Sequence, residues 1–112
     1  MWLDFDSGAS PDGQKGGVLD VRGTSYELWR DDNHGDRGDG KGWTYYTAKG
    51  PKLGLQGLLP IDAVLNAMAD KGYWDRSLYV SSVEFGNEVR SGTGSTWVKR
   101  YQVDVEATVA AP

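Results

Sequence analysis

The feature that most limits how this chain can fold is the even spread of its glycines, sixteen in 112 residues. They separate short runs of aromatic and β-branched residues, a pattern typical of strands joined by tight turns. We therefore expect an all-β fold, and we treat residues 1–112 as a single domain because the pattern continues without a repeat or a linker. The strands expected are Trp2 to Asp6, Gly17 to Arg22, Ser25 to Arg30, Gly42 to Ala48, Leu78 to Val89 and Thr96 to Ala107.

Two local features are more specific than this general pattern. The residues Arg22-Gly23-Thr24 leave room only for a tight turn, so the second and third expected strands should pair antiparallel. One helix is predicted from Pro60 to Lys71, because proline suits the first helical position, apolar residues recur at helical spacing, and Gly72 follows as a stop. We expect this helix to lie across the outside of a sheet.

The composition excludes several classes of function. The formal net charge is −4 and no run of Lys or Arg exceeds two residues, so the basic footprint of a nucleic-acid-binding protein is missing. No stretch approaches the ~18 apolar residues of a membrane span, and the first residues lack the pattern of a secretory signal. We expect neither a nucleic-acid nor a membrane partner. With no cysteine and one imidazole, His34, no cofactor, no multi-histidine metal centre and no Ser-His-Asp hydrolase is expected.

The segment from Tyr79 to Glu88 is the most informative about function. Strand-like alternation places Glu84 and Glu88 on one acidic face, opposite a mainly apolar face. Such carboxylates point to a sugar-handling cleft, since glycosidases work with two carboxyl groups. At about 3.3 Å per residue the two Cα atoms would lie roughly 13 Å apart, whereas the two carboxyls of a glycosidase lie about 5–9.5 Å apart. Glu84 and Glu88 are therefore not expected to form one catalytic pair.

Residues 31–42 are rich in Asp and Gly and invite comparison with a calcium loop. An EF-hand needs oxygen ligands at positions 1, 3 and 5, Gly at 6 and Glu at 12, and no frame of this segment supplies that set. We expect a solvated hairpin loop that holds no metal. The alternative is a calcium-binding or receptor-binding loop, the latter because Arg37-Gly38-Asp39 spells the tripeptide that integrins recognise.

Five tryptophans are numerous for a chain of this length. A tryptophan on an alternating strand is interpreted as a core residue, because large aromatic side chains dominate buried area. Trp2 differs, since alternation places it on one face with Asp4 and Asp6. Flat indole rings are good platforms for the apolar faces of sugars, and a mixed aromatic and acidic face resembles a binding surface. Trp2 is therefore predicted to bind substrate.

Several separate segments resemble the C-terminal half of a glycoside hydrolase family 12 endoglucanase, a β-jelly-roll enzyme that cleaves β-1,4-glucans or xyloglucan. Met1-Trp2-Leu3 resembles the end of the family's Glu-x-Met-x-Trp strand. Ser25-Tyr26-Glu27-Leu28-Trp29 is similar to its Trp-Glu-Leu-Tyr strand, and Gly42-Trp43-Thr44-Tyr45-Tyr46-Thr47 to its Trp-Thr-Val-Tyr-Ser strand. The predicted helix falls where the family has its single helix, and Tyr79 to Glu88 resembles its acid/base strand.

The resemblance implies a fold and a set of roles. The fold would be a jelly-roll, concanavalin-like antiparallel sandwich with one helix. Glu88 would be the general acid/base, which protonates the leaving glycosidic oxygen and then activates water. Glu84 stands where the family often carries Gln and would bind sugar hydroxyls or influence Glu88. The family nucleophile lies four residues before the Trp, so its position would precede Met1, and Arg90 stands where the family tends to have an aromatic residue.

These agreements and departures leave two main functions open. The first is a carbohydrate-directed domain, catalytically incomplete as given, that binds β-glucan or xyloglucan-type polysaccharide or serves as a structural module of a larger assembly. The alternative is the C-terminal half of an active retaining endo-β-1,4-glucanase or xyloglucanase. Because the family's jelly roll interleaves strands of a chain about twice as long, we expect a second chain or a missing N-terminal segment to cover the strand edges. An extracellular location is implied by the family alone.

Overall fold

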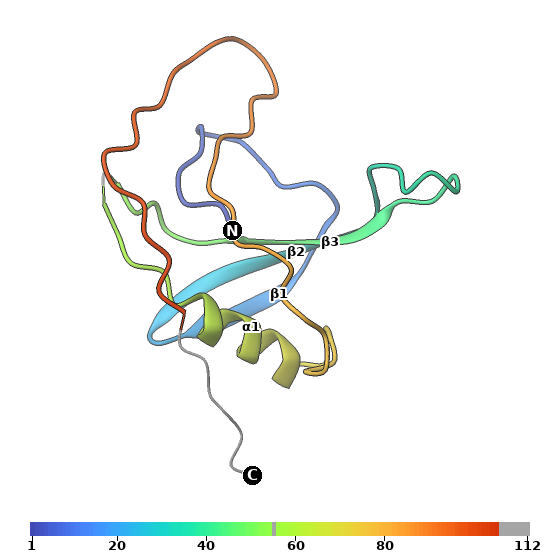
Figure 1. The fold of residues 1–112 in the computed structure, drawn as a ribbon. Coiled ribbons are helices and arrows are strands. Elements are labelled where there is room, and N and C mark those ends of the chain that lie inside the picture. The colour runs from blue at the N-terminus through green and yellow to red at the C-terminus, as the bar shows by residue number, and fades with distance from the viewer. Residues whose placement is uncertain (55, 106–112) are drawn as a thin grey trace. The chain divides into compact units, whose positions relative to one another are not determined.

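The computed structural model describes residues 1–54 and 56–105, and the chain divides into two compact units, Met1–Leu78 and Tyr79–Pro112 (Figure 1). The regular secondary structure of the described residues lies in the first unit. It consists of β1 (Gln14–Val21), β2 (Thr24–His34), β3 (Trp43–Lys49) and α1 (Ile61–Asp70). The strands form one antiparallel sheet in the order β1-β2-β3. The protein is thus mostly β with one short helix, as the glycine pattern predicts.

The β1–β2 hairpin closes through the tight turn that the sequence predicts. Val21 pairs with Thr24, and the two residues between them have positive φ angles, 48° at Arg22 and 82° at Gly23. Positive φ at both central residues is the mark of a type I′ turn, whose twist matches that of the strands it joins. The antiparallel pairing predicted here is confirmed, although β1 runs from Gln14 to Val21 rather than from Gly17 to Arg22.

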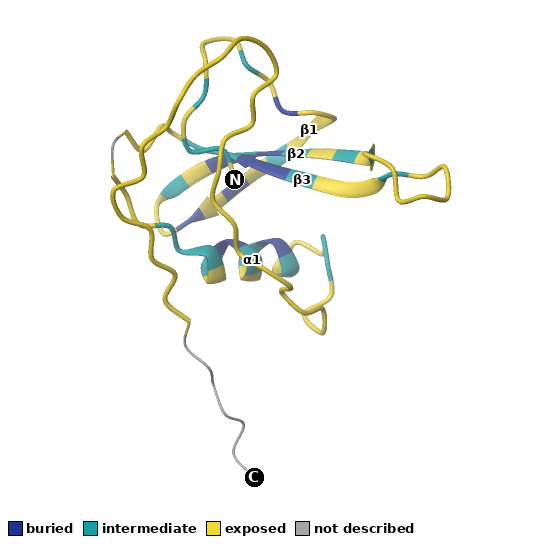
Figure 2. Ribbon diagram, turned by 45° about the horizontal axis from the view of Figure 1, so that its top comes forward, coloured by how far each residue is buried: buried dark blue, intermediate teal, exposed yellow. Residues whose placement is uncertain are grey.

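α1 packs on one face of the sheet, and the two enclose the core (Figure 2). Val64 and Met68 of the helix are one turn apart and both are buried, because side chains at i and i+4 share a helix face. The buried apolar side chains are Leu19, Val21, Tyr26, Leu28, Ala48, Val64 and Met68. Pro60 precedes the helix, and Gly72, with a φ of 81°, follows it. The predicted helix and its position against a sheet are confirmed.

The N-terminal strand predicted over Trp2 to Asp6 is reduced to a single bridge. Trp2 forms an isolated parallel bridge with Lys49, and the Trp2 amide donates to the Ala48 carbonyl at 2.9 Å. The next carbonyl, that of Leu3, accepts instead from the amide of Leu53 at 3.0 Å. The prediction is wrong beyond Trp2 because the backbone turns from β3 toward another segment.

The two strands predicted in the second unit are also absent from residues 79–105 as the structure describes them, and residues 106 and 107 of the last one lie outside this range. The rings of Phe85 and Tyr101 stack at 5.6 Å, and the Asn87 amide donates to the Thr96 hydroxyl at 2.8 Å. The two segments thus meet in antiparallel order through side chains, without a backbone ladder. Alternation specifies a strand only where a neighbouring strand accepts its backbone hydrogen bonds.

Within the described ranges, no helix combines the length and the apolar character that crossing a membrane requires.

A cross-strand cluster of charged and aromatic groups lies on the hairpin. The Glu27 carboxylate accepts a hydrogen bond from the Trp29 indole at 3.2 Å and pairs with the Lys15 ammonium at 3.3 Å. The hydrogen bond from Trp29, and then the one from Lys15, hold the pKa of Glu27 below its ordinary value. The ionised form of Glu27 is therefore the one that the folded hairpin favours.

We expect Glu27→Gln to weaken the acid sensitivity of folding. Because the folded state lowers the pKa of Glu27, ionised Glu27 stabilises the fold at neutral pH, and this stabilisation is lost as the pH falls through the lowered pKa. The glutamine variant cannot titrate, so its deficit in unfolding free energy should shrink from about pH 7 to about pH 3 in urea denaturation. Glu84→Gln, in the second unit, is the control. An equal pH dependence in both variants would contradict the assignment.

Candidate functional site

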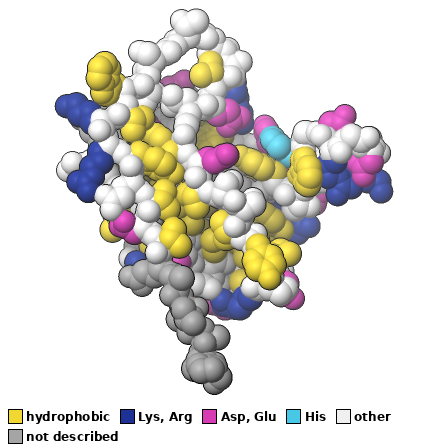
Figure 3. Space-filling model, viewed as in Figure 1, with side chains coloured by type: hydrophobic (Ala, Val, Ile, Leu, Met, Phe, Trp, Pro, Cys, Tyr) yellow, Lys and Arg dark blue, Asp and Glu magenta, His cyan; other side chains and the backbone are white. Residues whose placement is uncertain are grey.

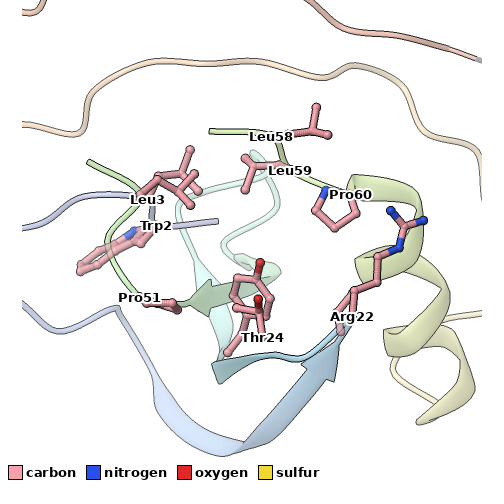
Figure 4. A pocket seen from close by; sticks show the side chains of 11 residues that line it. Trp2, Leu3, Arg22, Thr24, Pro51, Leu58, Leu59 and Pro60 are labelled. Carbon is pink, nitrogen blue, oxygen red and sulfur yellow. The ribbon is translucent and has the colours of Figure 1, made fainter. Parts of the chain in front are cut away.

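A cleft of about 300 Å³ opens in the first unit, at the turn end of the β1–β2 hairpin (Figure 4). Its lining comes from Trp2 and Leu3, from the hairpin end, from the segment after β3 and from the residues that lead into α1. Figure 4 shows Trp2 and Leu3 on one side of the cleft and Arg22 and Pro60 on the opposite side. Segments distant in the sequence therefore meet around one hollow.

Trp2 is held in the cleft wall by contacts at both its backbone and its ring. The bridge to β3 fixes the backbone, and the Trp2 ring lies 6.2 Å from the ring of Phe5. The Lys49 ammonium lies 6.0 Å from the Trp2 ring and 4.4 Å from the Phe5 ring, and it donates to the Ala9 carbonyl at 2.8 Å. A cation over aromatic faces is attracted to both rings, so Lys49 ties the N-terminal segment to β3.

Tyr26 and Gly50 determine how the chain crosses one side of the cleft. Tyr26 is buried and belongs to the core as well as to the cleft lining. A Cβ at Gly50 would lie 2.6 Å from the Tyr26 ring, so only glycine lets the chain pass this close to the aromatic ring. The close passage leads directly to Pro51 and then Leu53, which line the cleft.

The lining residues set the chemical character of the cleft. Its lining is mainly apolar and aromatic, with the Arg22 guanidinium and the hydroxyls of Thr24 and Tyr26 as polar groups. In the part of the chain that the structure describes, this lining includes neither a carboxylate nor an imidazole. The cleft can therefore hold a ligand with flat apolar faces and polar edges, and its lining does not contain the pair of carboxyl groups that a glycosidase uses.

Glu84 and Glu88, the two glutamates predicted to act on sugar, lie in the second unit, whereas Trp2 lies in the first. Both glutamates are exposed. The Glu88 carboxylate is 3.3 Å from the Arg90 guanidinium, with 53% of the Glu88 side chain and 46% of the Arg90 side chain exposed. Arg90, which stands where glycoside hydrolase family 12 tends to have an aromatic residue, thus pairs with Glu88, the predicted acid/base.

The acidic glycine-rich segment is partly strand rather than loop. The loop was predicted from residue 31, but β2 continues to His34, because Asp31 pairs with Tyr45 and His34 with Trp43. In the remaining loop the carboxylate of Asp36 accepts from the Gly38 amide at 2.7 Å, a bond that closes a turn. The charged ends of the Arg37-Gly38-Asp39 tripeptide pair with each other at 2.8 Å.

One group of potential metal ligands is not evident from the sequence of residues 31–42, because one of its members lies outside that segment. Asp12, Asp31 and His34 each offer a donor atom, and these atoms lie within 4.8 Å of one another. The spacing of Asp31 and His34 is a sequence signal for two of the three. Asp12 is nineteen residues before Asp31, and only the folded chain brings it to the other two.

Comparison of the chain with protein-family models, with curated proteins and with solved structures found no match. Over the described residues, the chain is a β-rich protein with one helix and an apolar, aromatic cleft at the end of its first hairpin.

Proposed function

We propose that this chain is a carbohydrate-directed, glucanase-like domain that binds a β-glucan or xyloglucan-type polysaccharide and is catalytically incomplete as given. The observation that carries the proposal is that Trp2, the residue predicted to bind sugar, lines a cleft together with Arg22 and Thr24. A sugar ring has apolar faces and hydroxyl edges. An indole can stack on such a face, while a guanidinium and a hydroxyl can form hydrogen bonds with the edge.

Binding is favoured over hydrolysis by the surroundings of the carboxylates. Hydrolysis of a glycoside with retention requires two carboxyl groups about 5–5.5 Å apart on either side of the scissile bond. The described cleft lining contains none, and Glu88 is half exposed and paired with Arg90. A glycosidase acid works instead in a partly desolvated cleft. Activity as an endo-β-1,4-glucanase is therefore the second candidate, and it would need a carboxylate partner for Glu88.

A jelly roll and a covering partner belong to the same proposal. Large apolar side chains of the second unit are exposed, among them Tyr79 at 98% and Trp97 at 88%, and Figure 3 shows hydrophobic side chains on the surface. Large apolar side chains that are exposed in an isolated chain are the ones that a binding partner can cover. We propose that a second chain, or a further segment of the same protein, adds strands at the outer edges of β1 and β3, and that the exposed apolar side chains of the second unit are likewise covered by a partner.

We expect Trp2→Ala to lower the affinity for cello- or xyloglucan-oligosaccharides about tenfold, or 1.4 kcal/mol, in calorimetric titration. The loss follows from removal of the ring that stacks on the sugar. Thr24→Val, which keeps the side-chain shape and removes the hydroxyl, should also weaken binding. Trp43→Ala is the matched control, because Trp43 is 58% exposed and lies outside the cleft lining. Amide spectra of the variants report whether each one is folded.

The outcomes separate the candidates. If the wild-type chain binds neither oligosaccharide, or if Trp43→Ala weakens binding as much as Trp2→Ala, the proposal is wrong. Incubation with β-glucan and xyloglucan should release no reducing sugar. Release that Glu88→Gln abolishes would replace the binding function by the glucanase activity.

A further inference from the structure

Three side chains with potential metal-ligand atoms lie close together at the end of the sheet opposite the hairpin turn, and none of them lines the cleft. They are Asp12, in the loop before β1, and Asp31 and His34 of β2. The His34 Nδ1 atom lies 3.2 Å from the Asp31 carboxylate and 3.6 Å from the Asp12 carboxylate. A mixed imidazole and carboxylate set of this kind is a donor set for transition metals.

A β-bulge places Asp31 and His34 on the same side of the strand. In a regular strand, residues three apart point to opposite faces, because successive side chains alternate. Between Asp31 and His34 the strand advances three residues while its partner advances two, from Tyr45 to Trp43. The extra residue of the bulge restores the two side chains to one face. Two ligands are thereby set by the pairing of β2 with β3.

The third potential ligand, Asp12, lies near the other two because the backbone next to it approaches β2 closely. Gly13 has a φ of 85°, and a Cβ built on it would lie 2.0 Å from the Arg30 carbonyl oxygen. The backbone at Gly13 therefore lies directly against the backbone of Arg30 and Asp31. Asp12 is the residue before Gly13 and is brought close to Asp31 by this contact. Glycine is required by both the φ angle and the contact. As a result, the carboxylates of Asp12 and Asp31 both lie near the Nδ1 atom of His34.

The distances from the imidazole nitrogen to the two carboxylates are close to those between ligands of one ion. The 3.2 Å contact of Nδ1 with Asp31 is within hydrogen-bond range, whereas the 3.6 Å contact with Asp12 is longer than a hydrogen bond. Around a tetrahedral ion with bonds of about 2.0–2.2 Å, neighbouring ligand atoms lie roughly 3.3–3.6 Å apart. The two distances to Nδ1, 3.2 and 3.6 Å, are close to this spacing. A cation among the three donor atoms would balance both negative charges.

The surroundings hold the ligands in place. The His34 ring stacks on Tyr45 with centroids 4.2 Å apart, which fixes the plane of the imidazole. The second oxygen of Asp31 accepts from the Asn33 amide at 3.0 Å, and the Asn33 side chain accepts from the Gly42 amide at 2.7 Å. The Tyr45 ring and the Asn33 amide thus restrain the His34 ring and the Asp31 carboxylate.

We propose that Asp12, Asp31 and His34 bind one divalent transition-metal ion, with zinc as the probe. One nitrogen and two oxygens with an open fourth position match the ligand number of a zinc site that also binds water. Calcium and magnesium require six or more oxygens and are disfavoured by the imidazole. The proposal is independent of the glycan-binding cleft, whose residues are not involved.

The test is a titration of the full chain, carrying no affinity tag, with Zn²⁺ followed by calorimetry and by NMR. His34 is the single histidine, so its ring signals are unambiguous. We expect binding of one equivalent, reversal by EDTA, and a shift of the His34 Nδ1 signal. Asp12→Asn and His34→Ala should each weaken binding at least about tenfold. Asp36→Asn, the same change in the neighbouring loop, should leave the affinity unchanged, and excess Ca²⁺ should not displace zinc.

The opposite results are equally clear. Absence of saturable binding, an unmoved Nδ1 signal, or equal losses in Asp12→Asn and Asp36→Asn would each overturn the site. Displacement of zinc by Ca²⁺ would overturn the choice of a transition metal.

Discussion

Replacing Leu28 with Ala is expected to lower the free energy of unfolding by about 2–5 kcal/mol. Leu28 is 2% exposed and lies on the central strand, between Gly17 of β1 and Ala48 of β3. Because these cross-strand neighbours are small, they cannot fill the cavity that the substitution leaves, and the loss should fall in the upper part of this range. It is a large share of the roughly 5–15 kcal/mol by which native proteins are stable.

Urea denaturation measures this loss as a lower transition midpoint with an unchanged slope. The matched control is Leu58→Ala, the same chemical change at a side chain that is 88% exposed. A change at an exposed site of this kind should stay within about 0.5 kcal/mol. If the two variants are equally stable, the core cannot be centred on β2 as described.

Replacing Gly13 with Ala should destabilise the protein by about 2–5 kcal/mol, from two additive causes. The first is the φ of 85°, which disfavours any residue with a Cβ. The second is overlap, since the new Cβ would meet the Arg30 carbonyl oxygen at 2.0 Å and the Asp31 nitrogen at 2.7 Å. Both contacts are with backbone, so β1 must separate from β2 at its first residues.

Gly8→Ala measures the first cause alone, so the difference between the two variants gives the second. Gly8 has a φ of 83°, nearly that of Gly13, but a Cβ there would meet nothing within 4 Å. We expect a loss of only about 1–2 kcal/mol for Gly8→Ala in the same denaturation experiment. Hydrogen exchange should show the added loss in Gly13→Ala as faster exchange at Gln14 and Lys15. Equal losses in the two variants would mean that the close approach at Gly13 does not exist.

The candidate sites differ in how far the sequence could reveal them. Trp2 was predicted as a sugar-binding residue from its acidic neighbours Asp4 and Asp6, and it does line a cleft, but for a different reason. Only Trp2 joins β3, and the strand face that motivated the prediction is not formed. The opposite wall, at Arg22, could not be predicted, because it depends on where the hairpin end meets the segment before α1.

The proposed metal ligands and the second unit both show that local sequence pattern does not determine strand pairing. His34 and Asp31 were assigned to a solvated loop because Asp and Gly residues are typical of turns, yet pairing with β3 draws both into a strand. Conversely, Leu78 to Val89 alternates like a strand, yet no backbone ladder forms in the described part of it. In each case the outcome depends on a partner that local pattern does not specify.

The sequence by itself determined the β-rich class, the turn at Arg22-Gly23 and the helix that follows Pro60. These features form hydrogen bonds and satisfy φ requirements within a few residues, so local chemistry is sufficient. The tertiary structure alone decided the cleft around Trp2 and the meeting of Asp12 with His34. Both depend on strand register and on close backbone contacts at Gly13 and Gly50, and these are fixed only when the whole unit packs.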